Sequence, residues 1–249
     1  MVHLLRLENV TKSYPSGHER HIFPLKGVNL EIVPGERIAL LGKSGSGKTT
    51  FLNILGGVDT PSAGSVFFGE REISALPAAE LAEYRRREVG FIFQSFNLFS
   101  TLTVGENVTL PLDLLGRSDH DRARELLAAV GLDGMWDRFP EQLSGGEQQR
   151  AAIARALVKG PSLILADEPT GNLDGETGAM ILDIIFGVSE RLNATLVVAT
   201  HSLEAVRSAH RVFKLKAGVL VETETHLAPG GTGTREPMVS AARGADSRK

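Results

Sequence analysis

The stretch RIALLGKSGSGKT, residues 37–49, decides the fold class of this chain. Its first five residues are typical of a short strand, and GKSGSGKT at 42–49 matches the pattern G-x-x-x-x-G-K-[ST] in full. This pattern binds phosphate where it follows a strand and opens a helix, and the spacing from Lys48 to Gly56 is helical. The stretch therefore predicts a phosphate-binding loop in an α/β protein.

The residue types of this loop suit a bound phosphate. Its glycines allow a tight turn with the backbone amides pointing inward, and those amides and the helix start form an anion-binding nest. Lys48 is expected to place its charge near the β and γ phosphates, and Thr49 to offer its hydroxyl to Mg²⁺. The predicted nucleotide-binding residues here are Gly42, Lys43, Ser44, Gly45, Ser46, Gly47, Lys48, Thr49 and Thr50.

Strand-like and helical segments alternate along the chain. LLRLENV (4–10) and VNLEIV (28–33) alternate apolar and polar residues, as half-buried strands do. Helical stretches separate the later strands, and this alternation predicts a largely parallel sheet. The further predicted strands are SVFFG (65–69), VGFIF (89–93), SLILA (162–166), TLVVAT (195–200) and RVFKL (211–215).

Two segments depart from the strand and helix alternation. Residues 79–150 have mainly helical composition and are predicted to form a helical insertion, entered by the strand at 89–93. Residues 226–249 are rich in Gly, Ala, Arg and Ser without periodicity, which predicts a disordered tail. The folded domain is therefore expected to span 3–225.

Composition narrows the function classes. A formal net charge of -3 does not draw the 249-residue chain to nucleic acid, and the lack of cysteine excludes disulfides and thiolate chemistry. No apolar run approaches the roughly 18–20 residues of a membrane helix, and MVHLLRLENV, with Glu8, is unlike a secretory signal. We expect a cytosolic chain that would need another polypeptide to act across a membrane.

An apolar strand ending in carboxylates is the second chemical feature. In LILADEP (163–169), Asp167 is expected where a parallel strand meets the nucleotide crevice, placed to hold Mg²⁺. Glu168 is one residue further and is placed to polarise an attacking water. The alternative, an exposed acidic pair before Pro169, is less favoured because a phosphate loop lies upstream.

A third motif, LSGGEQQR (143–150), has no role within a single phosphate-loop site. Ser144, Gly145 and Gly146 precede a helix, whose free amides attract phosphate. Ser144 and Glu147 also match an ordinary helix capping box, S-x-x-E. Both interpretations are open from the local sequence.

Together, and in the order in which they follow one another along the chain, the motifs resemble those of the nucleotide-binding subunits of ABC transporters, over residues 3–224. The resemblance implies a P-loop NTPase of the ABC ATPase fold, with a RecA-like core, an N-terminal antiparallel β subdomain and an α-helical subdomain. The other matching positions are Gln94 in FIFQSFNL (91–98), GNLD (171–174), His201 in VVATHS (197–202) and Tyr14 in TKSYPSG (11–17).

The resemblance also implies a homodimer that closes head to tail on ATP and Mg²⁺. Each ATP would lie between the phosphate loop of one chain and the LSGGE of the other. Gln94 would contact Mg²⁺ and water, His201 the γ-phosphate, and Tyr14 the adenine, while Asp174 would communicate between the sites. The implied residues of the second chain are Ser144, Gly145, Gly146 and Glu147.

A narrower resemblance concerns the branch of the family. LADEPTGNLD (165–174) and TVGENVTLPL (103–112) look like the lipoprotein-releasing, macrolide-export and cell-division ATPases. This implies a peripheral subunit on the cytoplasmic face of the cell membrane, bound to permeases with large extracytoplasmic domains that set the substrate. The alternatives are a cell-wall or cell-division regulator and, less favoured, a soluble ABC-type ATPase of DNA repair or translation.

Overall fold

The computed structural model describes residues 3–16 and 21–223. Among them no helix is long and apolar enough to cross a membrane. The strands are β1 (Leu5–Pro15), β2 (His21–Ile32), β3 (Arg37–Leu41), β4 (Ala63–Phe68), β5 (Arg71–Glu72), β6 (Val89–Phe93), β7 (Leu163–Asp167), β8 (Thr195–Thr200), β9 (Arg211–Lys216) and β10 (Val219–Thr223). The helices are α1 (Lys48–Leu55), α2 (Ala78–Glu88), α3 (Val104–Asp113), α4 (His120–Ala129), α5 (Gly145–Leu157), α6 (Gly175–Arg191) and α7 (Leu203–Ser208), with a 3-10 turn at Pro140–Gln142.

An antiparallel sheet forms the N-terminal part, in the order β2-β1-β4-β5. The strands β1 and β2 are longer than the alternation of residues predicts. Register shifts after Leu7, Val10 and Lys12 interrupt their pairing, and each shift resets which side chains face inward. A strict period of two therefore marks only part of each strand.

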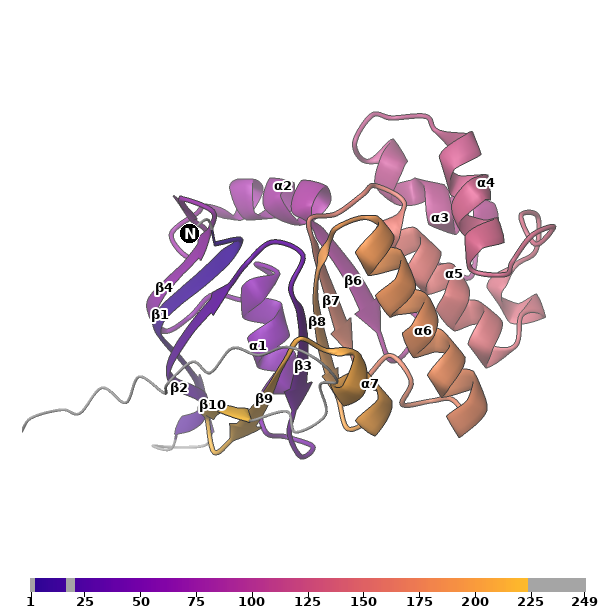
Figure 1. Ribbon diagram of the computed structural model, residues 1–249. Helices are drawn as coiled ribbons and strands as arrows, with labels where there is room; N and C mark the ends of the chain where they lie inside the picture. Colours follow the sequence, from indigo (N-terminus) through magenta and orange to yellow (C-terminus); the bar gives the residue numbers. More distant parts are fainter. Residues whose placement is uncertain (1–2, 17–20, 224–249) are drawn as a thin grey trace, which may run out of the picture.

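The second sheet has the order β10-β9-β3-β8-β7-β6, and all its pairs are parallel except β9 with β10. Alternate residues of β7 enter different cores: Leu163 and Leu165 join the core shared with β1, β2 and α1, while Ile164 and Ala166 join the core of α3 to α6. Burial on both faces explains the continuous apolar composition of this strand. Helix α1 lies between the two sheets, and α6 covers the opposite face (Figure 1).

These sheets and helices confirm the predicted α/β class, with a mainly parallel sheet and a separate antiparallel sheet at the N-terminus. Strands β5 and β10 were not predicted. Within the predicted helical insertion at 79–150, β6 pairs with β7 in the main sheet, and α2 places Leu81 and Tyr84 in the core of the antiparallel sheet. The insertion stays a prediction, and these contacts favour a start after Phe93. The predicted tail, 226–249, lies outside the described residues.

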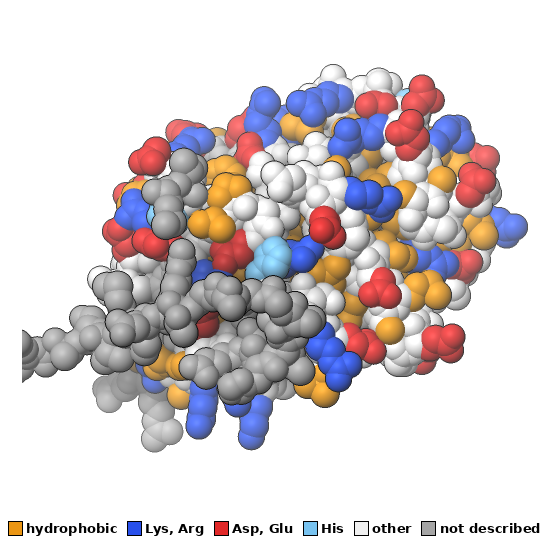
Figure 2. Space-filling view, viewed as in Figure 1, with side chains coloured by type: hydrophobic (Ala, Val, Ile, Leu, Met, Phe, Trp, Pro, Cys, Tyr) orange, Lys and Arg blue, Asp and Glu red, His pale blue; other side chains and the backbone are white. Residues whose placement is uncertain are grey.

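Charged side chains of both signs are interspersed over the helical part of the face shown in Figure 2. No continuous basic stripe, of the kind that tracks a nucleic-acid backbone, is visible among the described residues on that face.

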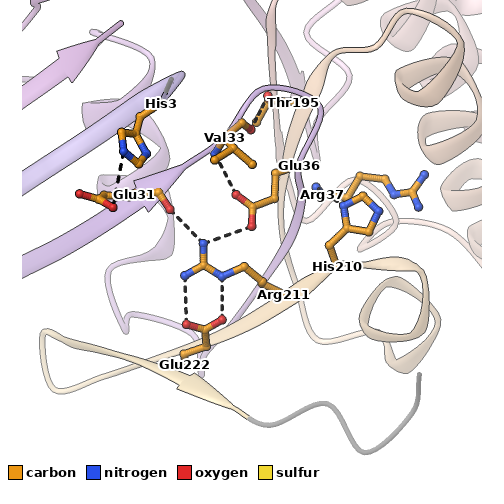
Figure 3. A network of polar contacts seen from close by, with 9 residues as sticks. All are labelled: His3, Glu31, Val33, Glu36, Arg37, Thr195, His210, Arg211 and Glu222. Atoms are coloured by element: carbon orange, nitrogen blue, oxygen red, sulfur yellow. Dashed lines mark hydrogen bonds and ion pairs between the residues drawn. The ribbon is translucent and has the colours of Figure 1, made fainter. Parts of the chain in front are cut away.

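A polar joint connects the two sheets (Figure 3). The Arg211 guanidinium of β9 donates to the carbonyl oxygen of Glu31 in β2 at 2.9 Å and to Glu36 Oε1 at 3.1 Å. Its Nε and Nη2 donate to the two carboxylate oxygens of Glu222 in β10, at 2.7 and 3.0 Å. Because the Glu36 side chain is only 9% exposed, this joint satisfies a carboxylate that solvent barely reaches.

Replacing Arg211 by methionine is expected to lower the free energy of unfolding by about 2–3 kcal/mol, because the buried Glu36 carboxylate loses its cation. Urea unfolding monitored by circular dichroism measures the change. The matched control is Arg71→Met, whose partner Glu80 is half exposed, and it should cost less than about 1 kcal/mol. Equal effects of the two substitutions would contradict a special role for the joint.

Candidate functional site

A cleft of about 640 Å³ lies at the carboxyl ends of the parallel strands. This is the edge of an α/β sheet at which ligands bind. The phosphate loop follows β3, Gln94 follows β6, Glu168 follows β7 and His201 follows β8. The cleft is lined by Tyr14, Ile22, Pro24, Gly42, Lys43, Ser44, Gly45, Ser46, Gly47, Lys48, Thr49, Thr50, Gln94, Asp167, Glu168, Gly171 and His201.

The backbone of the phosphate loop requires glycine at two of its positions. Gly45 and Gly47 have φ of +73° and +104°, a region that L side chains rarely adopt. A Cβ at Gly47 would also lie 2.6 Å from the carbonyl oxygen of Pro24. Gly47 begins α1 without a side-chain cap, so the first amides of this helix remain available to an anion.

Two side chains of the loop complete its donor set. Lys48 Nζ lies 2.8 Å from the carbonyl oxygen of Gly42 and 3.4 Å from that of Lys43, which folds the lysine back over the loop. Ser46 Oγ is buried and has no hydrogen-bond partner among the described residues. A buried hydroxyl without a partner, beside free amides and a lysine, fits a bound phosphate.

Asp167 lies at the end of β7, facing the helix that follows the loop. Thr49 Oγ1 donates to Asp167 Oδ2 at 2.6 Å. Burial raises the pKa of the Asp167 carboxyl, the Thr49 hydrogen bond opposes that shift, and the neighbouring Glu168 charge adds to it. A hydroxyl oxygen beside a carboxylate is a ligand pair that Mg²⁺ accepts, so these residues fit the predicted ion.

Glu168 is held between two other predicted residues of the site. Its Oε1 lies 3.1 Å from Lys48 Nζ and its Oε2 lies 2.9 Å from His201 Nδ1. Its backbone has φ of +46°, unusual for a residue with a side chain, and its amide donates to the carbonyl oxygen of Ala199 at 2.8 Å. This turn aims Glu168 into the cleft from the strand next to that of His201.

Gln94 is fixed from the opposite side of the cleft. Its Nε2 donates to Asn172 Oδ1 at 3.1 Å, and Asn172 Nδ2 donates back to the carbonyl oxygen of Gln94 at 3.0 Å. A Cβ at Gly171 would lie 2.6 Å from Gln94 Nε2, so the glycine makes room for this side chain. Gln94 and the segment after β7 are thus placed as one unit.

Tyr14 lies at the other end of the cleft, against the N-terminal sheet. Its hydroxyl donates to Asp59 Oδ2 at 2.5 Å, and Lys12 Nζ bonds Asp59 Oδ1 at 2.6 Å. The Lys12 ammonium also lies 4.9 Å from the centre of the tyrosine ring. Asp59, which follows α1, and Lys12, on the same strand as Tyr14, therefore hold the tyrosine side chain in place.

The LSGGE motif lies outside this cleft, since none of its residues is among the lining residues. The capping box is present: Ser144 caps α5, Glu147 N donates to Ser144 Oγ at 3.4 Å, and Glu147 Oε2 accepts from Ser144 N at 2.8 Å. The Ser144 hydroxyl also donates to Glu147 Oε2 at 2.7 Å, which lowers the pKa of that glutamate. Asp174, in the nearby GNLD segment, caps α6 by accepting a hydrogen bond from Thr177 N at 2.9 Å.

The sequence analysis assigned no individual role to four residues at the cleft. Asp59 holds Tyr14 from 45 positions away, which no local pattern signals. Ile22 is the cross-strand partner of Tyr14 in the β1–β2 pair, in a part of β2 that the sequence pattern did not predict as strand. Pro24 packs against the phosphate loop and Gly171 against Gln94, and both contacts depend on tertiary structure.

Comparison with known proteins identifies relatives over most of the chain. The family described as ABC transporter matches residues 25–171. The lipoprotein-releasing system ATP-binding protein LolD 1 of Rhodopirellula baltica is 45% identical over 221 residues, which cover 88% of this chain and 96% of that protein. The macrolide export ATP-binding/permease protein MacB of Escherichia coli is 40% identical over 248 residues, which cover 98% of this chain but 38% of that protein.

A solved structure has the same fold. The ATP-binding cassette MJ0796, in a dimeric post-hydrolysis state bound to ADP and Pi, superimposes with a TM-score of 0.82. Its sequence is 42% identical to this chain, and the match covers 88% of this chain and 98% of MJ0796.

Proposed function

Because the chain belongs to the ABC transporter family, we propose that it is the ATP-hydrolysing subunit that energises a separate membrane permease. The proposed task is export or extraction of a lipoprotein, lipid or drug-like substrate, in line with the LolD and MacB relatives. The observation that carries the proposal is one cleft that collects a phosphate loop, paired carboxylates, Gln94 and His201.

The cleft is proposed to bind ATP with Mg²⁺. The loop amides, Ser46 and Lys48 would hold the phosphates, and Tyr14 would stack on the base. No group of three or more His, Asp or Glu side chains that could hold a metal occurs in the described ranges. Thr49, Asp167 and Gln94 would therefore share the ion with phosphate oxygens and water, and the ion would neutralise charge on the phosphates.

Hydrolysis is proposed to use the residues around Glu168. Its carboxylate would orient a water for attack on the γ-phosphorus while the bond from that phosphorus to the β–γ bridging oxygen breaks and ADP leaves. The carboxylate would accept the proton of the water late, since phosphoryl transfer needs little activation of the nucleophile. Lys48 Nζ lies 3.1 Å from Glu168 Oε1 in the structure. When ATP binds, the Lys48 ammonium would leave Glu168 and contact phosphate oxygens. His201 would keep one nitrogen toward Glu168 and contact the γ-phosphate.

The site is proposed to be completed by a second copy of the chain. The LSGGE residues lie outside the cleft of their own chain, yet they form a helix N-terminus with Ser144 at its cap. Head-to-tail closure would bring this terminus onto the γ-phosphate bound by the partner. The dimeric MJ0796 cassette with ADP and Pi supports such an arrangement.

Replacing Ser144 by arginine should leave ATP binding by the isolated chain within about twofold, because no LSGGE residue lines the cleft. Steady-state hydrolysis should fall at least about tenfold, since the larger side chain blocks closure across the interface. Calorimetric titration and a phosphate-release assay measure the two quantities. If the isolated chain lost ATP binding instead, completion of the site by a partner would be the wrong explanation.

A groove of about 450 Å³ is proposed to receive a segment of the permease. It lies between α2, β6, α3 and α5, and its lining includes the apolar residues Phe91, Leu110 and Leu114 and the basic residues Arg86 and Lys159. Leu114 is 59% exposed, and the groove includes Phe93, the residue before Gln94. Its charge suits a short helix with apolar and acidic residues.

Capture of the partner tests the proposal. The Glu168→Gln chain is tagged, closed with ATP and Mg²⁺, and incubated with detergent-solubilised native membranes before mass spectrometry. Recovery of a permease with a large extracytoplasmic domain supports a role in transport. Adding Leu114→Glu to the tagged chain should abolish recovery of the permease. The control, Val221→Glu, changes a similarly exposed residue on β10 and should not affect recovery. Recovery of a cell-wall enzyme complex would favour the regulatory alternative, and recovery of soluble partners alone would contradict the membrane role.

A further inference from the structure

One buried side chain of α5 contacts the backbone on both sides of the cleft. Gln149 is fully buried, and its Nε2 donates to the carbonyl oxygen of Pro169 at 2.7 Å and to that of Phe93 at 3.3 Å. Pro169 directly follows Glu168, and Phe93 directly precedes Gln94. One amide group therefore bridges the residues next to the two side chains proposed to handle the attacking water.

Packing does not account for an amide at this position. Gln149 Oε1 is buried without a hydrogen-bond partner among the described residues, and an unsatisfied buried oxygen is destabilising. A methionine would fill a similar volume without that oxygen, but it would leave the Phe93 and Pro169 carbonyls without their donor. The bridge itself is what requires glutamine.

A second side chain of α5 holds the far end of the same loop. Arg155 Nη1 donates to the carbonyl oxygen of Asn97 at 2.5 Å, and its Nη2 donates to that of Phe96 at 2.9 Å. Phe96 and Asn97 have φ of +58° and +54°, so the loop turns sharply at the two residues whose carbonyl oxygens Arg155 bonds. Gln149 and Arg155 are six residues apart, about 9 Å along the helix, so α5 anchors residues 94–97 at both ends.

We propose that Gln149 is a positioning residue that ties the Ser144 end of α5 to Gln94 and Glu168. The inference rests on the proposed function, in which the N-terminus of α5 engages the nucleotide bound by a second copy. A displacement of α5 on closure is carried by the amide to the backbone of both cleft residues. Contact with the partner's nucleotide is thereby linked to water orientation in the chain's own cleft.

The test compares Gln149→Met with Asn107→Leu. Asn107 is also a fully buried amide, but its hydrogen bonds all lie beyond residue 98. Its Oδ1 accepts from Phe99 N at 2.8 Å, and its Nδ2 donates to the carbonyl oxygens of Phe99, Leu102 and Thr103. Both substitutions remove a buried amide, so a general loss of stability should affect both variants. Thermal unfolding curves identify a temperature at which both variants are folded, and the comparison is made there. Arg155→Lys serves as a milder second variant, because a lysine cannot hold two carbonyls in a fork.

Gln149→Met is expected to lower kcat at least about tenfold while KM and ATP affinity stay within about threefold, since a 1 Å misplacement can cost about 100-fold. Amide hydrogen exchange in residues 94–98, measured by mass spectrometry without nucleotide, should be faster in Gln149→Met and in Arg155→Lys, and unchanged in Asn107→Leu.

In a Gln94→Ala background the Gln149→Met effect on kcat should shrink, because the two changes act on one unit. Equal kcat and equal exchange for Gln149→Met and Asn107→Leu would overturn the inference. If the unchanged chain hydrolyses no ATP, the proposed function fails, and the exchange measurement still decides whether the anchor exists because it needs no turnover.

Discussion

Replacing Glu168 by glutamine is expected to lower ATP turnover at least about 100-fold, the largest effect of any single change considered. The amide keeps the size of the side chain but cannot accept a proton from the attacking water. It also loses the ion pair that the carboxylate makes with Lys48 Nζ at 3.1 Å and changes the contact with His201 Nδ1 at 2.9 Å. ATP should remain bound, because the phosphate loop is untouched.

The Glu168→Gln chain should consequently accumulate as a closed dimer in ATP and Mg²⁺. Removing the carboxylate also removes a negative charge beside the phosphates, which favours the bound state. Size-exclusion chromatography with and without ATP measures the dimer, and phosphate release measures kcat. A matched control is Glu204→Gln, a change at an exposed first-turn residue of α7, which should leave kcat within about twofold. Wild-type turnover by the Glu168→Gln chain would refute the catalytic assignment.

Lys48→Ala should weaken ATP binding at least about tenfold, since a hydrogen bond to a charged group contributes about 1.5–3 kcal/mol. The lysine also closes the loop on itself through the carbonyl oxygens of Gly42 and Lys43, so its loss removes both a charge and a constraint on the amides. Isothermal titration calorimetry with ATP gives the affinity.

The control for this charge is Lys26→Ala, which removes an exposed lysine outside the cleft. Its effect on affinity should stay within about twofold, as screened long-range attraction is weak at physiological salt. A tenfold loss of ATP affinity in both variants would mean that Lys48 acts only through the net charge of the chain. An unaltered ATP affinity of Lys48→Ala would argue against the phosphate-loop assignment.

The fold class could be predicted because its signals are local. The glycine spacing at 42–49 is typical of a tight phosphate-binding turn, which can be recognised without knowing the rest of the structure. The strands at 163–167 and 195–200 are apolar throughout because they are buried on both faces. The strand ends then bring Gln94, Glu168 and His201 together by topology alone. Their roles remain predictions that the substitutions above are designed to test.

Other parts depend on contacts that no short window of sequence contains. The length of β1 was hidden by its register shifts, and Asp59 reaches Tyr14 only because the turn after α1 meets the end of β1. Gln149 is part of the LSGGEQQR motif, but no role was predicted for it, because its bonds to the carbonyl oxygens of Phe93 and Pro169 depend on the folded structure. Such long-range pairings are decided by packing and not by local propensity.

The left-handed residues at 96 and 97 have a mechanical consequence. Glycines would adopt these φ values without strain, but they would also allow the loop many other conformations. Phenylalanine and asparagine, with their carbonyls held by Arg155, restrict the loop to few. A loop with few accessible conformations transmits a displacement of one of its ends to the other end. A glycine-rich loop would instead change its own conformation, and its other end would stay in place.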